Sequence, residues 1–145
     1  MSSETVIVAL DRFVHYFETL DRASVARLDL HYSADALFKD PFNEVRGIAA
    51  IERVFEHMFK TIESPRFVVT GRFSGDDGAM LIWDFHFTRG GGSAMLIRGT
   101  SHLRFGADGR CVFHRDYWDA AEELYEKLPL IGALMRFLKH RLRAI

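Results

Sequence analysis

The first half of the chain carries three segments in which apolar residues recur every three or four positions, the spacing of one helix face. These segments are residues 4–20, 22–32 and 48–62. Ser2 or Ser3 is a candidate N-cap for the first segment, and Gly47 stands just before the third. The pattern therefore predicts three helices.

From Arg66 onward apolar and polar residues alternate, which is the period of a strand with one buried face. Strands are predicted over residues 66–73, 79–89, 94–105 and 110–118, with glycine-containing turns between them. If the middle turn is centred on Gly91, Asp84 lies opposite Arg98 as a cross-strand ion pair on the solvent face. The other face, which we predict to be the core or pocket side, carries Trp83, Phe85 and Phe87 opposite Ile97, Gly99 and Ser101.

A helical pattern returns over residues 120–143 and is interrupted at Pro129. Its apolar stripe consists of Leu124, Leu128, Ile131, Met135, Leu138 and Leu142. The outer face of its second half is basic, which is typical of a solvated face or a subunit contact, with an anionic membrane or nucleic acid as alternatives. We expect one domain over residues 1–119 and an amphipathic helix over 120–145 that packs on it.

The order of these elements indicates the α+β class, with helices packed on one face of a curved antiparallel sheet. Between the second and third helices, a short strand runs into the turn at Asp40-Pro41. Proline favours extended geometry in the residue before it, so the Asp40 carboxylate is held at a strand end. Phe38 and Phe42 flank it, and poor solvation there would suit a proton-transfer group. The alternative is a turn aspartate that accepts hydrogen bonds from its own backbone.

The amino-acid composition argues against several classes of function. Thirteen phenylalanines are enough to line an apolar pocket, and the net charge of −1 gives no general attraction to nucleic acid or acidic membranes. The single cysteine, Cys111, excludes an internal disulfide and lies in an apolar strand. No histidine pair has the spacing of a helical zinc site, and we expect no metal or cofactor. The alternative is a site assembled across the strands from His86, His102 and His114. No apolar run is long enough to span a membrane, and we expect a cytoplasmic protein.

Several motifs together resemble one superfamily. They are Tyr16-Phe17-Glu18, Tyr32-Ser33-Ala34-Asp35-Ala36, Asp40-Pro41-Phe42, Gly47 with Ile51, Leu103-Arg104-Phe105 with Asp108-Gly109-Arg110, and Tyr117-Trp118-Asp119. The chain resembles the nuclear transport factor 2-like superfamily, and within it the branch of ketosteroid isomerases and SnoaL-like polyketide cyclases. The resemblance runs from about Val6 to Asp119 and implies a cone-shaped fold of three N-terminal helices on the curved sheet.

The resemblance also implies roles for individual residues. It puts Asp40 at the position of the isomerase general base and Tyr16 at that of the tyrosine that stabilises the dienolate oxygen, chemistry that the isomerase family supplies. Ser101 stands where the isomerase has a second, protonated aspartic acid. Two further residues correspond to the tyrosines that support the oxyanion tyrosine: Tyr32, which is present, and Phe55, which replaces the other.

Strand alternation places His114, Asp116 and Trp118 on one face, and the resemblance makes this the pocket face. The alternatives are that Arg115 and Tyr117 face inward, or that His114 is a hydrogen-bonded core histidine. The predicted apolar lining is Phe13, Phe17, Phe55, Phe85 and Trp118, and the predicted polar groups are Tyr16, Asp40, Ser101, His114 and Asp116. The default ligand of such a pocket is a small, mostly hydrophobic molecule.

Three functions follow as hypotheses. In the first, the protein is an isomerase-type or cyclase-type enzyme that transfers a proton, with Asp40 as base and Tyr16 as donor. In the second, it is a binding domain without chemistry. In the third, it is a dimerisation module whose basic tail contacts a partner. A homodimer through the open sheet face, as is common in the superfamily, is the expected assembly.

Overall fold

The computed structural model describes residues 2–124 and 129–144. The helical elements in chain order are α1 (Ser3–Glu18), the 3₁₀ helix η1 (Ser24–Leu30), α2 (Ile48–Thr61), α3 (Ala120–Glu123) and α4 (Pro129–Leu142). The strands are β1 (Tyr32–Lys39), β2 (Glu44–Arg46), β3 (Glu63–Gly75), β4 (Gly78–Arg89), β5 (Ser93–Phe105) and β6 (Cys111–Tyr117). This confirms the predicted α+β class.

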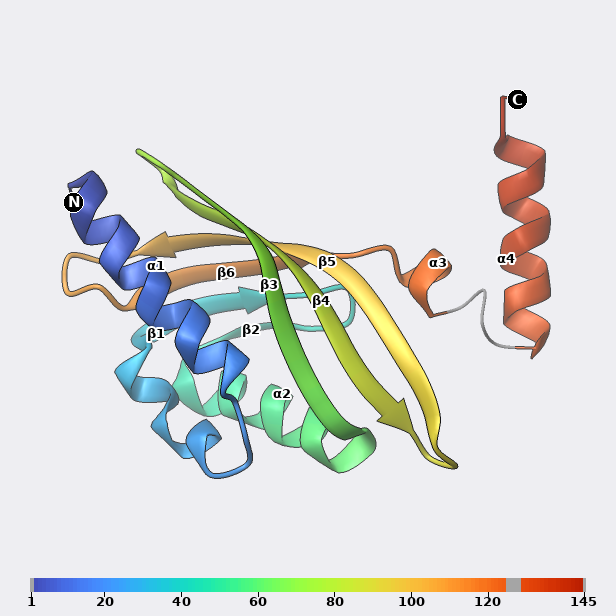
Figure 1. Ribbon diagram of the computed structural model, residues 1–145, viewed down its shortest axis with the longest axis horizontal. Helices are drawn as coiled ribbons and strands as arrows, with labels where there is room; N and C mark the ends of the chain where they lie inside the picture. The colour runs from blue at the N-terminus through green and yellow to red at the C-terminus, as the bar shows by residue number, and fades with distance from the viewer. Residues whose placement is uncertain (1, 125–128, 145) are drawn as a thin grey trace.

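The six strands form one curved, unclosed sheet in the order β2-β1-β6-β5-β4-β3 (Figure 1). Most neighbours are antiparallel, as predicted, but β1 pairs with β6 in parallel. The short strand β2, which the sequence did not predict, forms because the Asp40-Pro41 turn folds the chain back on β1. The parallel pair places the ends of β1 and β6 side by side, with Phe38 opposite His114.

The helices α1, η1 and α2 lie together against one face of the sheet (Figure 1). Ser2 is the N-cap of α1 and accepts a hydrogen bond from the Thr5 amide. The predicted second helix is shorter than residues 22–32, because Tyr32 already belongs to β1. Gly47 begins α2 with a φ of 93°, a left-handed conformation that glycine adopts without strain.

Alternation along β4 and β5 gives the predicted register, with Asp84 opposite Arg98. The predicted ion pair between them is replaced, because Arg98 binds Glu123 of α3 at 3.0 Å. The inward face is buried as predicted. On that face Gly99 lies under the Trp83 ring, and any Cβ at position 99 would overlap the indole. The missing side chain at Gly99 therefore leaves the space that the Trp83 ring occupies on the neighbouring strand.

The helix α4 differs from its prediction. Its first residue is Pro129, where the break was expected, but the helix stands apart from the sheet and from α1 and α2, with α3 as its main neighbour (Figure 1). Of the predicted stripe, Leu124 and Met135 are half-buried, Leu128 lies outside the described residues, and Ile131, Leu138 and Leu142 are exposed. Among the described helices, none is long and apolar enough to cross a membrane.

His31, between η1 and β1, stacks on Tyr16 at 4.0 Å between ring centroids, and its buried Nδ1 has no hydrogen-bond partner among the described residues. Burial lowers the pKa of His31, and the nearby Arg12 and Arg27 guanidinium groups lower it further. Below pH ~6.5 the unfolded chain therefore binds a proton that the folded chain resists, so stability falls as the pH falls.

We predict that His31→Phe, which keeps the stacked ring, removes this contribution. Urea unfolding between pH 7.5 and 5 should show a smaller loss of unfolding free energy in the variant than in the wild type. Because the other histidines are the same in both proteins, the difference reports His31 alone. Parallel pH profiles for the two proteins would contradict the prediction.

Candidate functional site

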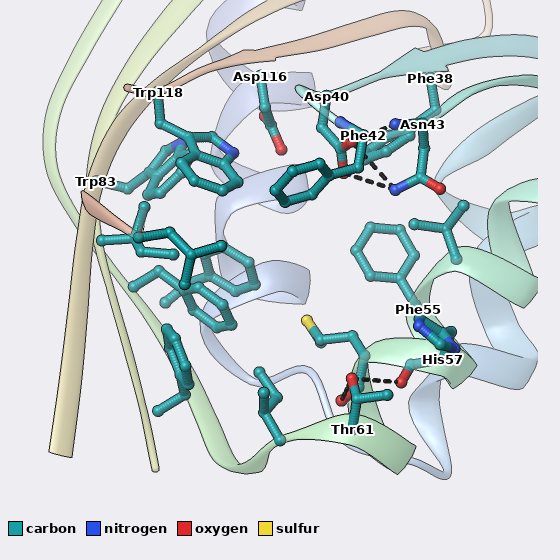
Figure 2. A pocket seen from close by; sticks show the side chains of 18 of the residues that line it. Phe38, Asp40, Phe42, Asn43, Phe55, His57, Thr61, Trp83, Asp116 and Trp118 are labelled. Carbon is teal, nitrogen blue, oxygen red and sulfur yellow. Dashed lines mark hydrogen bonds between the residues drawn. The ribbon is translucent and has the colours of Figure 1, made fainter. Parts of the chain in front are cut away.

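An open cavity of about 750 Å³ lies between α2, the turn after β1, and the inward face of β3 to β6 (Figure 2). This volume is in the range of small-molecule sites. Its apolar lining consists of Phe38, Phe42, Val54, Phe55, Met58, Ile62, Phe67, Trp83, Phe85, Phe87, Ile97, Trp118 and Leu124. Its polar lining consists of Asp40, Asn43, His57, Thr61, Arg89 and Asp116. The cavity is thus mostly apolar, with two carboxyl groups.

A chain of buried hydrogen bonds lies behind one wall of this cavity. The Tyr32 hydroxyl is 2.6 Å from His114 Nδ1, and His114 Nε2 is 2.6 Å from Asp116 Oδ1. Ser101 Oγ donates to the same Asp116 oxygen at 2.5 Å and accepts from Trp83 Nε1 at 2.8 Å. The chain crosses four neighbouring strands in sheet order, from β1 through β6 and β5 to β4.

One arrangement of the protons gives every hydrogen bond between Tyr32 and Trp83 both a donor and an acceptor. Complete burial raises the pKa of Tyr32 well above its ordinary value, so its hydroxyl stays protonated and donates a hydrogen bond to His114 Nδ1. With Nδ1 as the acceptor, the ring proton of His114 lies on Nε2, which donates a hydrogen bond to Asp116 Oδ1. The rings of Phe13, Phe17 and Phe38 surround the imidazole edge-on.

Asp116 links this chain to the cavity. Its Oδ1 accepts hydrogen bonds from both Ser101 and His114, whereas its Oδ2 has no hydrogen-bond partner among the described residues. Figure 2 shows the carboxyl group of Asp116 directed into the cavity between Trp118 and Phe42. One oxygen is therefore fixed by the protein, and the other is left to meet a ligand.

Asp40 lines the same cavity but is held by its own turn. Its Oδ1 accepts from the backbone amides of Phe42 at 2.8 Å and Asn43 at 2.7 Å, and the Asn43 side-chain amide lies 3.1 Å away. This is the hydrogen-bonded turn aspartate that the sequence offered as an alternative. Among the residues that the structure describes, its Oδ2 has a single partner, the Asn43 side chain at 3.2 Å.

Tyr16, the predicted hydrogen-bond donor, lies in the core and not at the cavity. Its hydroxyl donates to the Ser24 carbonyl oxygen at 2.6 Å in the core, and its ring stacks on His31. It does not line the cavity, and burial raises its pKa above the ordinary value for tyrosine. The structure therefore does not bring Tyr16 together with Asp40, because the Ser24 carbonyl of η1 accepts the hydrogen bond of the Tyr16 hydroxyl.

Strand alternation is confirmed on β6. Asp116 and Trp118 line the cavity, and Arg115 lies over the Tyr117 ring on the opposite face. His114 does not line the cavity: it is buried beneath it, and it is the hydrogen-bonded core histidine that the sequence offered as an alternative. Phe55, Phe85 and Trp118 line the cavity as expected. Four other predicted residues do not: Phe13, Phe17 and Ser101 border a separate void of about 30 Å³ beneath it, and Tyr32 is fully buried.

The sequence reasoning missed several lining residues. Asn43 could have been found as the third residue after Asp40, where a turn amide usually points back to the aspartate. Trp83 was placed on the correct face but not at the cavity. His57 and Thr61 lie on the exposed side of the predicted helix, and no signal in the sequence marks them. No group of three or more potential metal ligands occurs within residues 2–124 and 129–144.

The model of the SnoaL-like domain family matches residues 13–114, more than half of the chain, so the chain belongs to this family. No curated protein matches the chain. An NTF2-like protein of unknown function from Exiguobacterium sp. 255-15 is similar in structure, with 23% identity, a TM-score of 0.66, and coverage of 77% of this chain and 98% of that one.

Two other solved structures are similar at lower identity. A putative SnoaL-like polyketide cyclase from Shewanella denitrificans is 17% identical, with a TM-score of 0.68 over 81% of this chain and 96% of that one. A protein from Mycobacterium tuberculosis, solved in complex with estradiol-17β-hemisuccinate, is 18% identical, with a TM-score of 0.64 over 79% and 94%. At these identities the likeness concerns the fold.

We predict that Tyr32→Phe lowers the free energy of unfolding by about 1–3 kcal/mol, because it leaves His114 Nδ1 buried without a donor. Urea unfolding measures the change. Tyr117→Phe is the matched control: it makes the same substitution at an exposed tyrosine and should change stability by less than about 0.5 kcal/mol. Equal effects of the two substitutions would show that the buried chain contributes nothing.

Proposed function

We propose that this member of the SnoaL-like domain family binds a small, mostly apolar molecule in its cavity and catalyses proton transfer on it, with Asp116 as the base. The observation that carries the proposal is the divided role of the Asp116 carboxylate. One oxygen is fixed by Ser101 and His114, and the other faces the apolar cavity. A positioned carboxylate beside a bound C–H or O–H group is the minimum that general base catalysis needs.

In this proposal the proton passes from the ligand to Asp116 Oδ2. The negative charge then moves from the carboxylate to the ligand, and the new carboxylic acid returns the proton to another atom of the ligand. The hydrogen bonds from Ser101 and His114 hold Oδ1 throughout, which fixes the direction in which Oδ2 points. Tyr32 acts as a positioning residue, because it keeps the His114 proton on Nε2.

The charge that develops on the ligand needs a donor. Tyr16 donates its hydroxyl to Ser24, so we assign this role to the indole N–H of Trp118. Trp118 lines the cavity two residues after Asp116 on the same face, and its Nε1 has no acceptor among the described residues. Its ring meets Phe42 edge-on at 5.4 Å, which gives the ligand an aromatic wall.

The second candidate is ligand binding without chemistry. It is favoured by the fact that Asp40 and Tyr16, the two residues that the resemblance marks as catalytic, are both occupied by hydrogen bonds within the protein. For either function we propose a homodimer. The outer face of the sheet exposes Phe73, Met80, Ile82, Val112 and Tyr117, which is apolar surface suited to a second copy.

We predict that the wild-type protein accelerates exchange of the α-hydrogens of apolar cyclic ketones with D₂O, followed by mass spectrometry. Asp116→Asn should reduce the enzymatic rate at least ~100-fold, the usual contribution of a general base, while ketone binding stays within a few-fold of wild type. Asp40→Asn is the matched control, because it makes the same change in the same cavity and should retain most of the rate.

The three possible results separate the hypotheses. Loss of exchange in Asp40→Asn with activity kept in Asp116→Asn would return the base to Asp40. Binding of the ketone with no exchange by the wild type would favour the second candidate. Exchange that neither substitution affects would disprove carboxylate catalysis in this cavity.

We further predict that Trp118→Phe, which keeps an aromatic ring but removes the N–H, lowers the exchange rate about 10- to 100-fold and changes ketone binding little. The pH dependence of exchange should keep its shape, because the base is untouched. An equal loss of binding and rate would instead make Trp118 a wall of the cavity and not a donor to the developing charge.

A further inference from the structure

The helix α4 carries an apolar face that no other part of the described chain covers. Leu130 is 87% exposed and Leu142 84%, and Phe137 is 59% exposed between them. The other exposed apolar side chains of this helix are Ile131, Leu134 and Leu138. The helix stands away from the sheet in Figure 1, with α3 as its main neighbour. An exposed apolar face of this size marks a site of interaction with another protein or a membrane.

The rest of α4 is strongly basic. Residues 129–143 contain Arg136, Lys139, His140, Arg141 and Arg143 and no aspartate or glutamate. At 3.6 residues per turn the apolar side chains share one side of the helix, and all the basic residues but one share the other. Arg141 falls within the apolar side near the end of the helix, where its long side chain can extend to the polar boundary.

We propose that α4 docks on a bilayer surface rich in anionic phospholipids, with its axis along the surface. The apolar face would enter the boundary between headgroups and acyl chains, and the basic residues would meet the phosphate and carboxylate groups of the lipids. With 14 residues the helix is ~21 Å long, which suits a helix lying on a bilayer and is too short for one that crosses it.

The charge of α4 favours an anionic bilayer over a second copy of the helix or a nucleic acid. A second copy of α4 packed on the first would bring two groups of cations together with no acidic residue in either helix to offset them. A nucleic acid would pair with the cations but leave the apolar face exposed to water. An anionic bilayer covers the apolar face and neutralises the cations together, and this docking is independent of the chemistry proposed for the cavity.

Sedimentation with phospholipid vesicles tests the proposal on the full chain. We expect binding to vesicles of phosphatidylcholine with 30–40% phosphatidylglycerol, and at least tenfold weaker binding to phosphatidylcholine alone or at 0.5 M salt. Arg141→Gln and Arg143→Gln should each weaken partitioning about fivefold, which corresponds to ~1 kcal/mol per charge. Phe137→Ser should weaken it more than tenfold, because a buried ring is lost.

The matched control is Leu30→Ser, which changes an apolar residue of nearly the same exposure, 56%, at the end of η1 and outside the proposed dimer face. This variant should bind vesicles as the wild type does, and circular dichroism should show that both serine variants keep the fold. Absence of binding to anionic vesicles at low salt would overturn the proposal. Equal losses in the Phe137 and Leu30 variants would also overturn it. So would light scattering that shows a dimer which Phe137→Ser dissociates, because a second copy would then cover the helix.

Discussion

The burial of His114 is the constraint on which the rest of the domain depends. An imidazole inside a protein needs a partner for each ring nitrogen, because an unpaired polar atom there costs about 1–3 kcal/mol. Tyr32 satisfies one nitrogen and Asp116 the other. Tyr32 begins β1 and His114 lies on β6, so the first hydrogen bond depends on the parallel pairing of these two strands, whereas the second joins two residues of β6.

The same requirement makes Asp116 available to the cavity. A carboxylate that only closed a core network would have both oxygens bonded within the protein. Here two donors bind Oδ1, and Oδ2 faces a mostly apolar cavity that is rich in phenylalanine and tryptophan rings. The aromatic residues thus fill the core around His114 and also line the cavity in front of Asp116. Stability and the candidate chemistry therefore depend on one set of contacts.

Local patterns predicted the features that depend on local geometry. Alternation gave the inward face of β4 to β6 and the opposition of Asp84 and Arg98, because side chains on a strand change face at every residue. The parallel pairing of β1 with β6 was not predictable in this way, because it joins segments some 80 residues apart along the chain, such as Tyr32 and Cys111. The partner of Arg98 was missed for a related reason, since Glu123 lies on a helix that follows the sheet.

The contacts of Tyr16 and of α4 could not be predicted from local sequence patterns. The resemblance put Tyr16 in the pocket as a donor, but which acceptor its hydroxyl meets depends on the backbone of η1. The sequence pattern of α4 likewise predicts an apolar face but not what covers it. The family resemblance ends near Asp119, so it gives no information on the packing of α4.

The near-zero net charge of the chain is the sum of a basic helix α4 and an acidic remainder. All 20 acidic residues lie outside residues 129–143, together with 15 of the 19 lysines and arginines, so the remainder of the chain has a formal charge of −5. An anionic bilayer would attract the helix and repel the body of the domain. The repulsion acts over roughly a Debye length, ~8 Å at physiological salt, which is comparable to the width of one helix. On a membrane the helix would therefore lie flat while the domain stands off the surface, which leaves the cavity open to a ligand from either the lipid or the water.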